Sequence, residues 1–407
     1  MLNSKTDKKE PHWELITFAA AAMLMVTMGA RQSLGLFVAP MNISTGLGVV
    51  TISFAMAINQ FVWGAVQPFT GALTDRYGAG RVLVAGLLIF ALSNVLTPQV
   101  TTSFGLVLTI GLLSAVGAGA VSFSVLIGAV SRRVPAGHRG TAAGVINAGS
   151  SFGQFVFAPL LQVLISAFGW MAAMWSLAFI TMGTLPLARF MRGSQTSAVS
   201  TAGTASGPWA AVKDALADRS YLLLHAGFFT CGFHIAFLVT HLPGEVDLCG
   251  LPASAASWSL AIIGLANIFG SLAAGWSVNH YRSKYVLFWM YGSRALLVLL
   301  YLLAPKSVWT FYLFAAGLGF TWLATVPPTA GVVGKLFGTR YLATLFGLTL
   351  LSHQTGGFFG AWLGGIAITH YGNYLWMWYA DALLATTAAL CNLPIREPRI
   401  VRHAVLA

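Results

Sequence analysis

Long apolar runs, separated by short stretches that hold nearly all of the charge, make up most of this sequence of 407 residues. A helix needs about 20 apolar residues to cross the hydrocarbon core of a bilayer. Runs of that length lie at residues 14–40, 48–72, 80–99, 104–131, 141–168, 170–192, 219–243, 253–278, 284–304, 307–333, 341–369 and 372–394. Each is predicted to be helical because lipid offers no partner to an unpaired backbone group. The sequence therefore predicts an all-α membrane protein with twelve transmembrane helices.

The composition excludes a soluble fold. Only 8% of the residues are charged and 57% are hydrophobic, whereas about 25% of a soluble domain is charged. The first residues, "MLNSKTDKKEPHWELITF", lack the short apolar core and cleavage site of a signal peptide, so we expect a retained tail. The three cysteines have no metal-binding spacing and are expected to be small packing residues.

The basic residues orient the chain. If the N-terminus is cytoplasmic, nineteen of the 22 Lys and Arg residues fall on the cytoplasmic side and only Lys306 falls outside, while Arg31 and Arg294 lie within spans. This asymmetry follows the positive-inside rule and predicts that both termini are cytoplasmic, in an inner (plasma) membrane. The net charge of +12 is therefore topological, and no nucleic-acid partner is expected.

One internal stretch divides the chain into two repeated halves. Residues 193–218 are rich in Ser, Thr, Ala and Gly and are predicted to form a flexible cytoplasmic linker between residues 1–192 and 219–407. Six spans precede the linker and six follow it, before a cytoplasmic tail. The halves align at an offset of 203 or 204 residues, which pairs Gly71 with Gly275, Gly144 with Gly347 and Gly169 with Gly372. Such a duplication indicates a transporter with its site between the halves, near mid-membrane.

The segment "GALTDRYGAGRVL" resembles the signature loop of the major facilitator superfamily. The matching positions are Gly71, Leu73, Asp75, Arg76, Gly78 and Arg81. The second copy, "GWSVNHYRSK", is degenerate, with Asn279 and His280 in place of the acid and the arginine. The stretches "GARQSLGLF", "NQFVWGAVQPFTGALTDRYG" and "SHQTGGFFGAWLGG" are similar to the bacterial monocarboxylate-transporter and oxalate–formate-exchanger branch. The resemblance implies two pseudo-symmetric six-helix bundles, alternating access, and a path lined by spans 1, 4, 7 and 10.

The signature loop is a candidate conformational gate. Gly71 and Gly78 permit a close approach and a tight turn. The Asp75 carboxylate can accept hydrogen bonds from the N-terminal end of a helix in the other half, which would close the cytoplasmic side while the outer side is open. The loop arginines, Arg76 and Arg81, complete the motif. The alternative is a simple turn with cytoplasmic positive charges.

Arg31 lies too deep in the first span to reach water easily. It is about four residues beyond the middle of the span, some 6 Å toward the outer face, where a charge costs at least about 2.5 kcal/mol. Alignment of Gly29 with Gly232 pairs Arg31 with His234. Two facing basic groups would form an anion site, with the planar guanidinium suited to a carboxylate. The alternatives are an arginine held by helix carbonyls and Gln60, and a histidine that bonds only backbone.

Three further ionisable groups lie deep in spans. His353 could contact the substrate or carry a coupling proton, or it could simply pack between helices made close by Gly356 and Gly357. Arg294 lies at the midplane of span 9, and Asp381 is the only acid deep in any span. A direct ion pair would neutralise both. Otherwise Arg294 turns inward and Asp381, like His234 and His353, is a candidate proton site.

The remaining polar groups and the missing motifs define the predicted function. Weaker substrate-binding candidates on facing spans are Gln60, Ser122, Asn147 and Gln354. No Walker loop, zinc motif or nucleophile elbow occurs, so neither an enzyme nor a cofactor or metal is expected. The sequence predicts a monomeric secondary-active carrier of a small organic anion, most simply a monocarboxylate, with proton symport. Alternatives are anion exchange of the oxalate/formate type, export of an amphiphile such as a drug or siderophore, and a non-transporting receptor.

Overall fold

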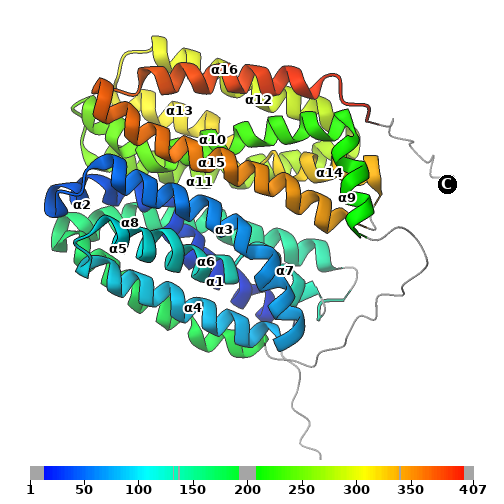
Figure 1. Ribbon diagram of the computed structural model, residues 1–407, viewed down its shortest axis with the longest axis horizontal. Helices are drawn as coiled ribbons and strands as arrows, with labels where there is room; N and C mark the ends of the chain where they lie inside the picture. The colour runs from blue at the N-terminus through cyan, green and yellow to red at the C-terminus, as the bar shows by residue number, and fades with distance from the viewer. Residues whose placement is uncertain (1–12, 132, 136–137, 192–207, 339–340, 398–407) are drawn as a thin grey trace, which may run out of the picture.

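The computed structural model describes residues 13–131, 133–135, 138–191, 208–338 and 341–397, and this part of the chain is almost entirely helical (Figure 1). The elements of the first half are α1 (Trp13–Gln32), η1 (Leu34–Phe37), α2 (Val38–Thr45), α3 (Val49–Tyr77), α4 (Ala79–Leu96), η2 (Thr97–Gln99), α5 (Ser103–Leu106), η3 (Val107–Ser114), α6 (Ala115–Ala120), α7 (Phe123–Ser131), α8 (Arg139–Gly183) and η5 (Leu185–Met191). Those of the second half are α9 (Pro208–Ala217), α10 (Arg219–Leu248), α11 (Ala253–His280), α12 (Ser283–Leu303), α13 (Val308–Thr321), α14 (Val326–Phe337), α15 (Leu342–Tyr371) and α16 (Leu375–Asn392).

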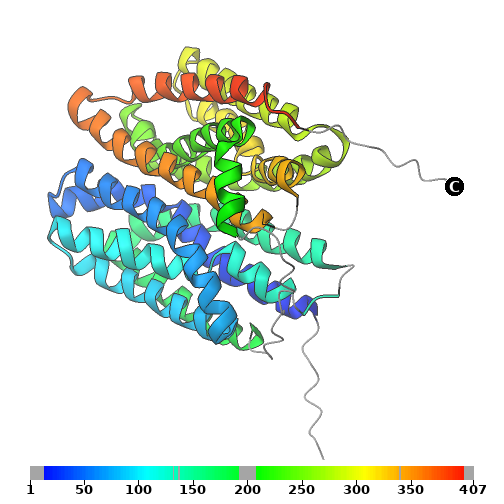
Figure 2. The ribbon, with the colours of Figure 1, turned by 45° about the vertical axis from the view of Figure 1, so that its right-hand side comes forward.

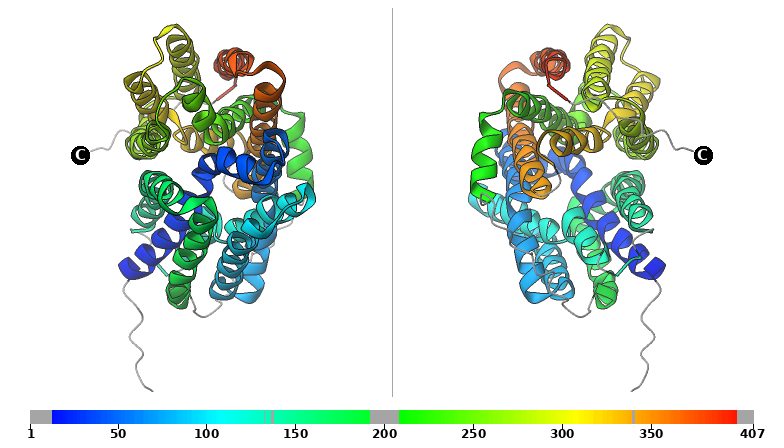
Figure 3. Two further views of the ribbon diagram at one scale, coloured as in Figure 1. Left: turned by 90° about the vertical axis from the view of Figure 1, so that its left-hand side faces the viewer. Right: turned by 90° about the vertical axis from the view of Figure 1, so that its right-hand side faces the viewer.

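The helices lie in two groups that follow the two halves of the sequence. Figure 1 shows α1 to α8 together in the lower part of the view and α9 to α16 in the upper part. The end-on views of Figure 3 show the same division. The groups pack together through α3 against α15 and α8 against α11. Most of the surface between the halves is therefore built from spans 2, 5, 8 and 11, and η1 adds contacts with α10.

Nine helical stretches among the described residues are long and apolar enough to cross a membrane. One of them, Thr141–Met191, has 51 residues, or about 77 Å of helix, more than twice the thickness of a bilayer core. It is broken at Gly169, whose φ of 83° is open to glycine but strained for other residues. Helices α15 and α16, with 30 and 18 residues, are not among the nine. Twelve spans therefore stay a prediction.

Local sequence signals set the helix ends. The Asp218 carboxylate accepts hydrogen bonds from the backbone N–H groups of Ser220 and Tyr221 and so caps the start of α10. Gly372, which the repeat pairs with Gly169, also has a positive φ, at the end of α15. Gly169 and Gly372 therefore have the same role in the two halves: each lets the chain reverse between two long helices.

The predicted linker is too long at its C-terminal end. Its residues 193–207 lie outside the described part of the chain, but Pro208–Ala217 forms the helix α9. Pro208 suits the first turn of a helix because its φ is already helical and its missing N–H needs no partner there. Val212 and Ala215 are buried where α9 packs against α10 and α15 (Figure 2). The apolar spacing within a polar segment explains this helix.

The two groups touch closely toward one end of the molecule. A methyl group placed on Gly365 of α15 would lie 2.6 Å from the Ser53 side chain of α3. One on Gly264 of α11 would lie 2.7 Å from the Ser151 carbonyl oxygen of α8. Between the latter two helices, the Asn267 side chain donates a hydrogen bond to the Ser151 hydroxyl at 2.8 Å. These contacts leave no room for a larger residue.

The same helix faces separate toward the other end. Gly71 lies seven residues beyond Gly64, which touches Gln354 across the boundary, and so shares its face of α3. Gly144 and Gly347, which the repeat pairs with each other, lie near the corresponding ends of α8 and α15. No described atom of another element lies within 4 Å of a methyl group placed on any of these three glycines. Among the described residues, the boundary helices are therefore further apart at the end that carries the predicted cytoplasmic loops.

Candidate functional site

Arg31 lies in the last turn of α1 and is 8% exposed. Its Nη2 donates a hydrogen bond to Oε1 of Gln60 in α3, and its guanidinium carbon lies 4.2 Å from the centre of the Trp63 ring. Its Nε has no hydrogen-bond partner within the described residues. The guanidinium is thus neither turned to lipid nor paired with an acid there. The arrangement with Gln60 that the sequence left open is the one observed.

The guanidinium sits beside the boundary between the halves. The Cβ of its partner Gln60 is 3.6 Å from a methyl group placed on Gly357 of α15. Its chain neighbour Gln32 accepts a hydrogen bond from Nε1 of Trp322, in the other half, at 3.3 Å. The Arg31 guanidinium therefore lies at a level where the two halves are in contact.

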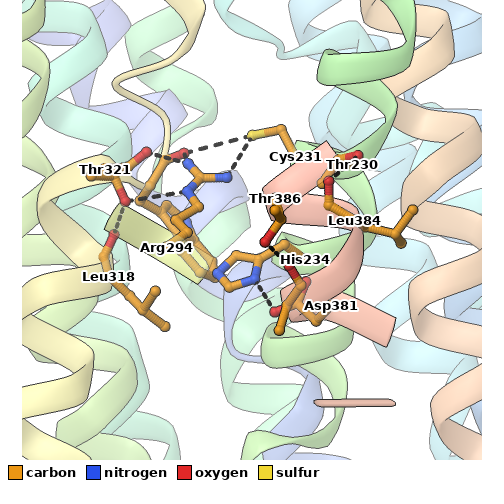
Figure 4. A network of polar contacts seen from close by, with 11 residues as sticks. Thr230, Cys231, His234, Arg294, Leu318, Thr321, Asp381, Leu384 and Thr386 are labelled. Atoms are coloured by element: carbon orange, nitrogen blue, oxygen red, sulfur yellow. Dashed lines mark hydrogen bonds and ion pairs between the residues drawn. The ribbon is translucent and has the colours of Figure 1, made fainter. Parts of the chain in front are cut away.

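His234 has a partner other than Arg31. Its Nδ1 lies 2.5 Å from Oδ2 of Asp381, and both side chains are fully buried between α10 and α16 (Figure 4). No hydrogen bond joins His234 to Arg31 in the described part of the chain. The repeat places the two basic groups at matching depths, but α10 packs against α16 of its own half. The prediction of two facing basic groups at one site is therefore not supported by the observed contacts.

The described contacts do not include an ion pair between Arg294 and Asp381, so that predicted alternative is wrong. Its Nε donates to the Thr321 hydroxyl at 3.2 Å and its Nη1 to the Cys231 sulfur at 3.2 Å. Its Nη2 donates to the carbonyl oxygens of Thr321 and, at 2.6 Å, Trp322 (Figure 4). These carbonyls belong to the free end of α13, which needs donors inside a membrane. Although α12 and α16 pack together, the helix end takes the guanidinium.

The break that frees those carbonyls follows from two prolines. Between α13 and α14 the chain turns at residues 322–325, and Pro327 and Pro328 follow at the start of α14. Proline lacks an N–H and clashes with the preceding turn, so the helix cannot run through this point. The "VPP" of span 10 is the sequence signal for this break, although span 10 was predicted as one continuous run. Trp322 lies in the turn and is fully buried.

The other proposed site residues lie near the boundary between the halves but form no single cluster. His353 is 6% exposed; its ring lies 4.8 Å from the Phe228 ring, and its Nδ1 is 3.2 Å from Nε2 of Gln354. The Ser122 hydroxyl bonds to Ser124 at 3.0 Å, within the first half. Asn147 is half-buried, one turn from Ser151 on the boundary face of α8. The His353 ring thus contacts Phe228 of its own half, and its Nε2 has no hydrogen-bond partner among the described residues, while Gln354 and Asn147 lie where the halves meet.

The gate motif is only partly described. Gly78 ends α3 with a φ of 87°, as its place in a tight turn requires. Arg81 is exposed, and the exposed Arg76 stacks 5.3 Å from the Tyr77 ring. The Asp75 side chain lies outside the described residues. Whether the motif closes against the other half stays a prediction.

A carboxylate that the sequence did not single out joins the start of α12 to the end of α14. Glu397 is buried, and it accepts hydrogen bonds from the backbone N–H groups of Ser283 at 2.9 Å and Lys284 at 2.8 Å. The Lys335 ammonium donates to it at 2.7 Å. These groups come from the start of α12 and the end of α14, so only the tertiary structure brings them together.

Comparisons with known proteins agree with this architecture. The profile described as Major Facilitator Superfamily matches residues 20–361 and 247–405. The chain is 26% identical over 403 residues to monocarboxylate transporter 13 of Rattus norvegicus, covering 96% of this chain and 91% of that protein. It is 23% identical over 379 residues to the oxalate:formate antiporter of Oxalobacter formigenes, with coverage of 88% and 86%. It is also 22% identical to the fujikurins efflux protein of Gibberella fujikuroi, with coverage of 56% and 48%.

Proposed function

Since the chain belongs to the Major Facilitator Superfamily, a family of membrane transporters, we propose that it is a secondary-active carrier of a small organic anion. The most economical substrate is a monocarboxylate. In this proposal twelve spans form two six-helix bundles, and the bundles rock about the contacts of α3 with α15 and α8 with α11. The open end is the cytoplasmic one, both termini are cytoplasmic, and a monomer in the inner membrane suffices.

One observation carries the proposal: the buried guanidinium of Arg31 faces the boundary between the halves with no acid beside it among the described residues. A charge at this depth is costly and is usually compensated by a partner or by water. A carboxylate would supply the missing negative charge, and the guanidinium can donate to both of its oxygens. Its Nε has no present partner. Gln60 would keep the guanidinium oriented.

The neighbouring polar groups would orient the rest of the substrate. Gln354 faces α3 at the level of Gly64, and Asn147 lies on the boundary face of α8. Ser122 and His353 are more distant contributors, since both have partners within their own halves. The names of the monocarboxylate transporter and of the oxalate:formate antiporter support an anion.

Coupling to protons is the favoured mode, and anion exchange is the second. Export of an amphiphile is a further candidate, because one of the similar proteins is named as an efflux protein. Proteoliposomes loaded with unlabelled lactate, oxalate or acetate and then exposed to the labelled acid would distinguish these functions. Exchange of label supports an anion carrier. An exporter of amphiphiles would not exchange short acids, and a receptor would bind them without flux.

The decisive variant is Arg31→Gln. Loss of a charge-assisted contact of about 1.5–3 kcal/mol is expected to raise the half-saturating substrate concentration by roughly ten- to 150-fold. Arg31→Lys keeps the charge but loses the planar fork, so it should recover only part of the affinity. Lys213→Gln, which removes an exposed charge on α9, is the matched control and should behave as wild type. Unchanged uptake kinetics in Arg31→Gln would remove Arg31 from the site.

A further inference from the structure

The buried pair of His234 and Asp381 has one vacant proton position. With neutral imidazole, His234 donates its Nδ1 proton to Oδ2 of Asp381 at 2.5 Å. Neither Nε2 of His234 nor Oδ1 of Asp381 has a hydrogen-bond partner in the described part of the chain. Buried polar atoms are seldom left in this state. The lone pair on Nε2 can accept one proton, which would turn the pair into an imidazolium beside a carboxylate.

None of the described charged groups around the pair competes with His234 for a hydrogen bond to Asp381. The titratable groups around the pair, from the helices packed against it, are Cys231 of α10, Tyr291 and Arg294 of α12, and His353 of α15. Beyond Trp378, one turn from Asp381, Tyr301 donates to Glu245 at 2.6 Å. Arg294 has its donors committed to the end of α13 and to the sulfur of Cys231. The carboxylate therefore has His234 as its one described hydrogen-bonding partner.

The pair is also connected to the boundary between the halves. The His234 ring lies edge-on to the Trp322 ring, with centres 6.0 Å apart. Trp322 in turn donates to Gln32, the residue next to Arg31, at 3.3 Å. Ala236, half a turn beyond His234, packs with Ala57 and Ala361 across the closed part of the boundary. Through Trp322 and Gln32, the His234 ring is thus linked by contacts to the other half.

We infer that the His234–Asp381 pair is the proton-binding site that couples transport to the proton gradient. One proton from water binds Nε2 on one side of the membrane and leaves from the same atom to water on the other side. The carboxylate stays ionised and stabilises the imidazolium. This inference rests on the proposed function, because a coupled proton needs a co-transported anion. It gives His353 no part in proton coupling.

The test uses wild-type protein and the isosteric variant Asp381→Asn in proteoliposomes with labelled lactate. For one proton per anion, a pH gradient of one unit supports about tenfold accumulation in wild type. Asp381→Asn should lose this accumulation and keep at least half of the wild-type counterflow at equal pH on both sides. His234→Asn should do the same. The control is His225→Asn, which removes a histidine of α10 that bonds Ser352 and no described acid.

Two outcomes would overturn the inference. Tenfold accumulation by Asp381→Asn would show that the proton binds elsewhere. Loss of counterflow in a variant that melts like wild type would show that the pair serves substrate binding or the conformational change itself. An infrared difference spectrum of the purified protein between pH 5 and pH 8 needs no substrate. It should show a histidine signal that Asp381→Asn shifts. Absence of wild-type counterflow together with this signal would refute the proposed function and leave the proton site standing.

Discussion

The substitution Gly264→Ala tests the claim that the structure is closed at one end and open at the other. Gly264 lies on the face of α11 that contacts α8 of the other half. A methyl group there would be 2.7 Å from the Ser151 carbonyl oxygen and 2.9 Å from the Phe155 backbone nitrogen. Gly144 of α8, seven residues before Ser151 and so on the same face, has no described neighbour from another element within 4 Å of an added methyl group. Gly144→Ala is therefore the matched control.

The structure sets the size of the effect. An ordinary contact needs about 3.5 Å, so α8 and α11 must move apart by roughly 0.8 Å at this point. Overpacking of this kind costs about 1–3 kcal/mol. The helix propensity of alanine over glycine, about 1 kcal/mol, is gained in both variants and in both conformations, so it cancels. The conformation closed at this end should lose population relative to the opposite one by about five- to 150-fold.

Electron–electron resonance distances between spin labels would measure this shift. Suitable sites are Ile43 of α2 and Leu303 of α12, each 84% exposed and at the closed end of its own half. Cys249 and Cys391 would be replaced by serine, while Cys231 is buried and can remain. Gly264→Ala should add a population at longer distance, and Gly144→Ala should not. Identical distance distributions for the two variants would refute the assignment of the closed and open ends.

Two further predictions concern stability. Glu397→Gln removes the charge that Lys335 and two backbone N–H groups share, so the free energy of unfolding should fall by about 1–3 kcal/mol. The control Asp247→Asn, at an exposed acid, should leave the melting temperature unchanged. Equal melting temperatures of the two variants would contradict the role of Glu397. Arg294→Lys keeps the charge but cannot reach all of the groups at the end of α13, so it should lower the melting temperature more than Thr321→Val, which loses one bond; the reverse order would exclude Arg294 as the cap.

Much of the architecture could be predicted because membrane helices are specified locally. A run of about 20 apolar residues must be helical in lipid whatever surrounds it. Gly169 and Gly372 were paired by the repeat alone, and both adopt positive φ between long helices. The start of α9 and the break after Thr321 were missed, although Pro208 and the "VPP" of span 10 were visible signals. Both are interruptions within a run that hydropathy treats as uniform.

The candidate site was harder to predict because its partners are far apart in the chain. Gln60 was named as a neighbour of Arg31 because both occupy facing polar positions of adjacent spans. The pairing of His234 with Asp381 joins residues 147 positions apart, and the repeat suggested a different neighbour for His234. Glu397 was not considered a site residue, since its partners lie 62 to 114 positions away.

The sequence by itself determined that this chain is a membrane protein, that it is built from repeated helical halves, and that an arginine side chain lies deep in its first span. These properties depend on hydropathy and on the cost of an unpaired backbone group, which are set residue by residue. The tertiary structure alone decided which deep charges meet. Arg294 donates to the carbonyl oxygens at the broken end of α13, and Asp381 pairs with His234 instead. Such partners lower the cost of burying charged and polar groups.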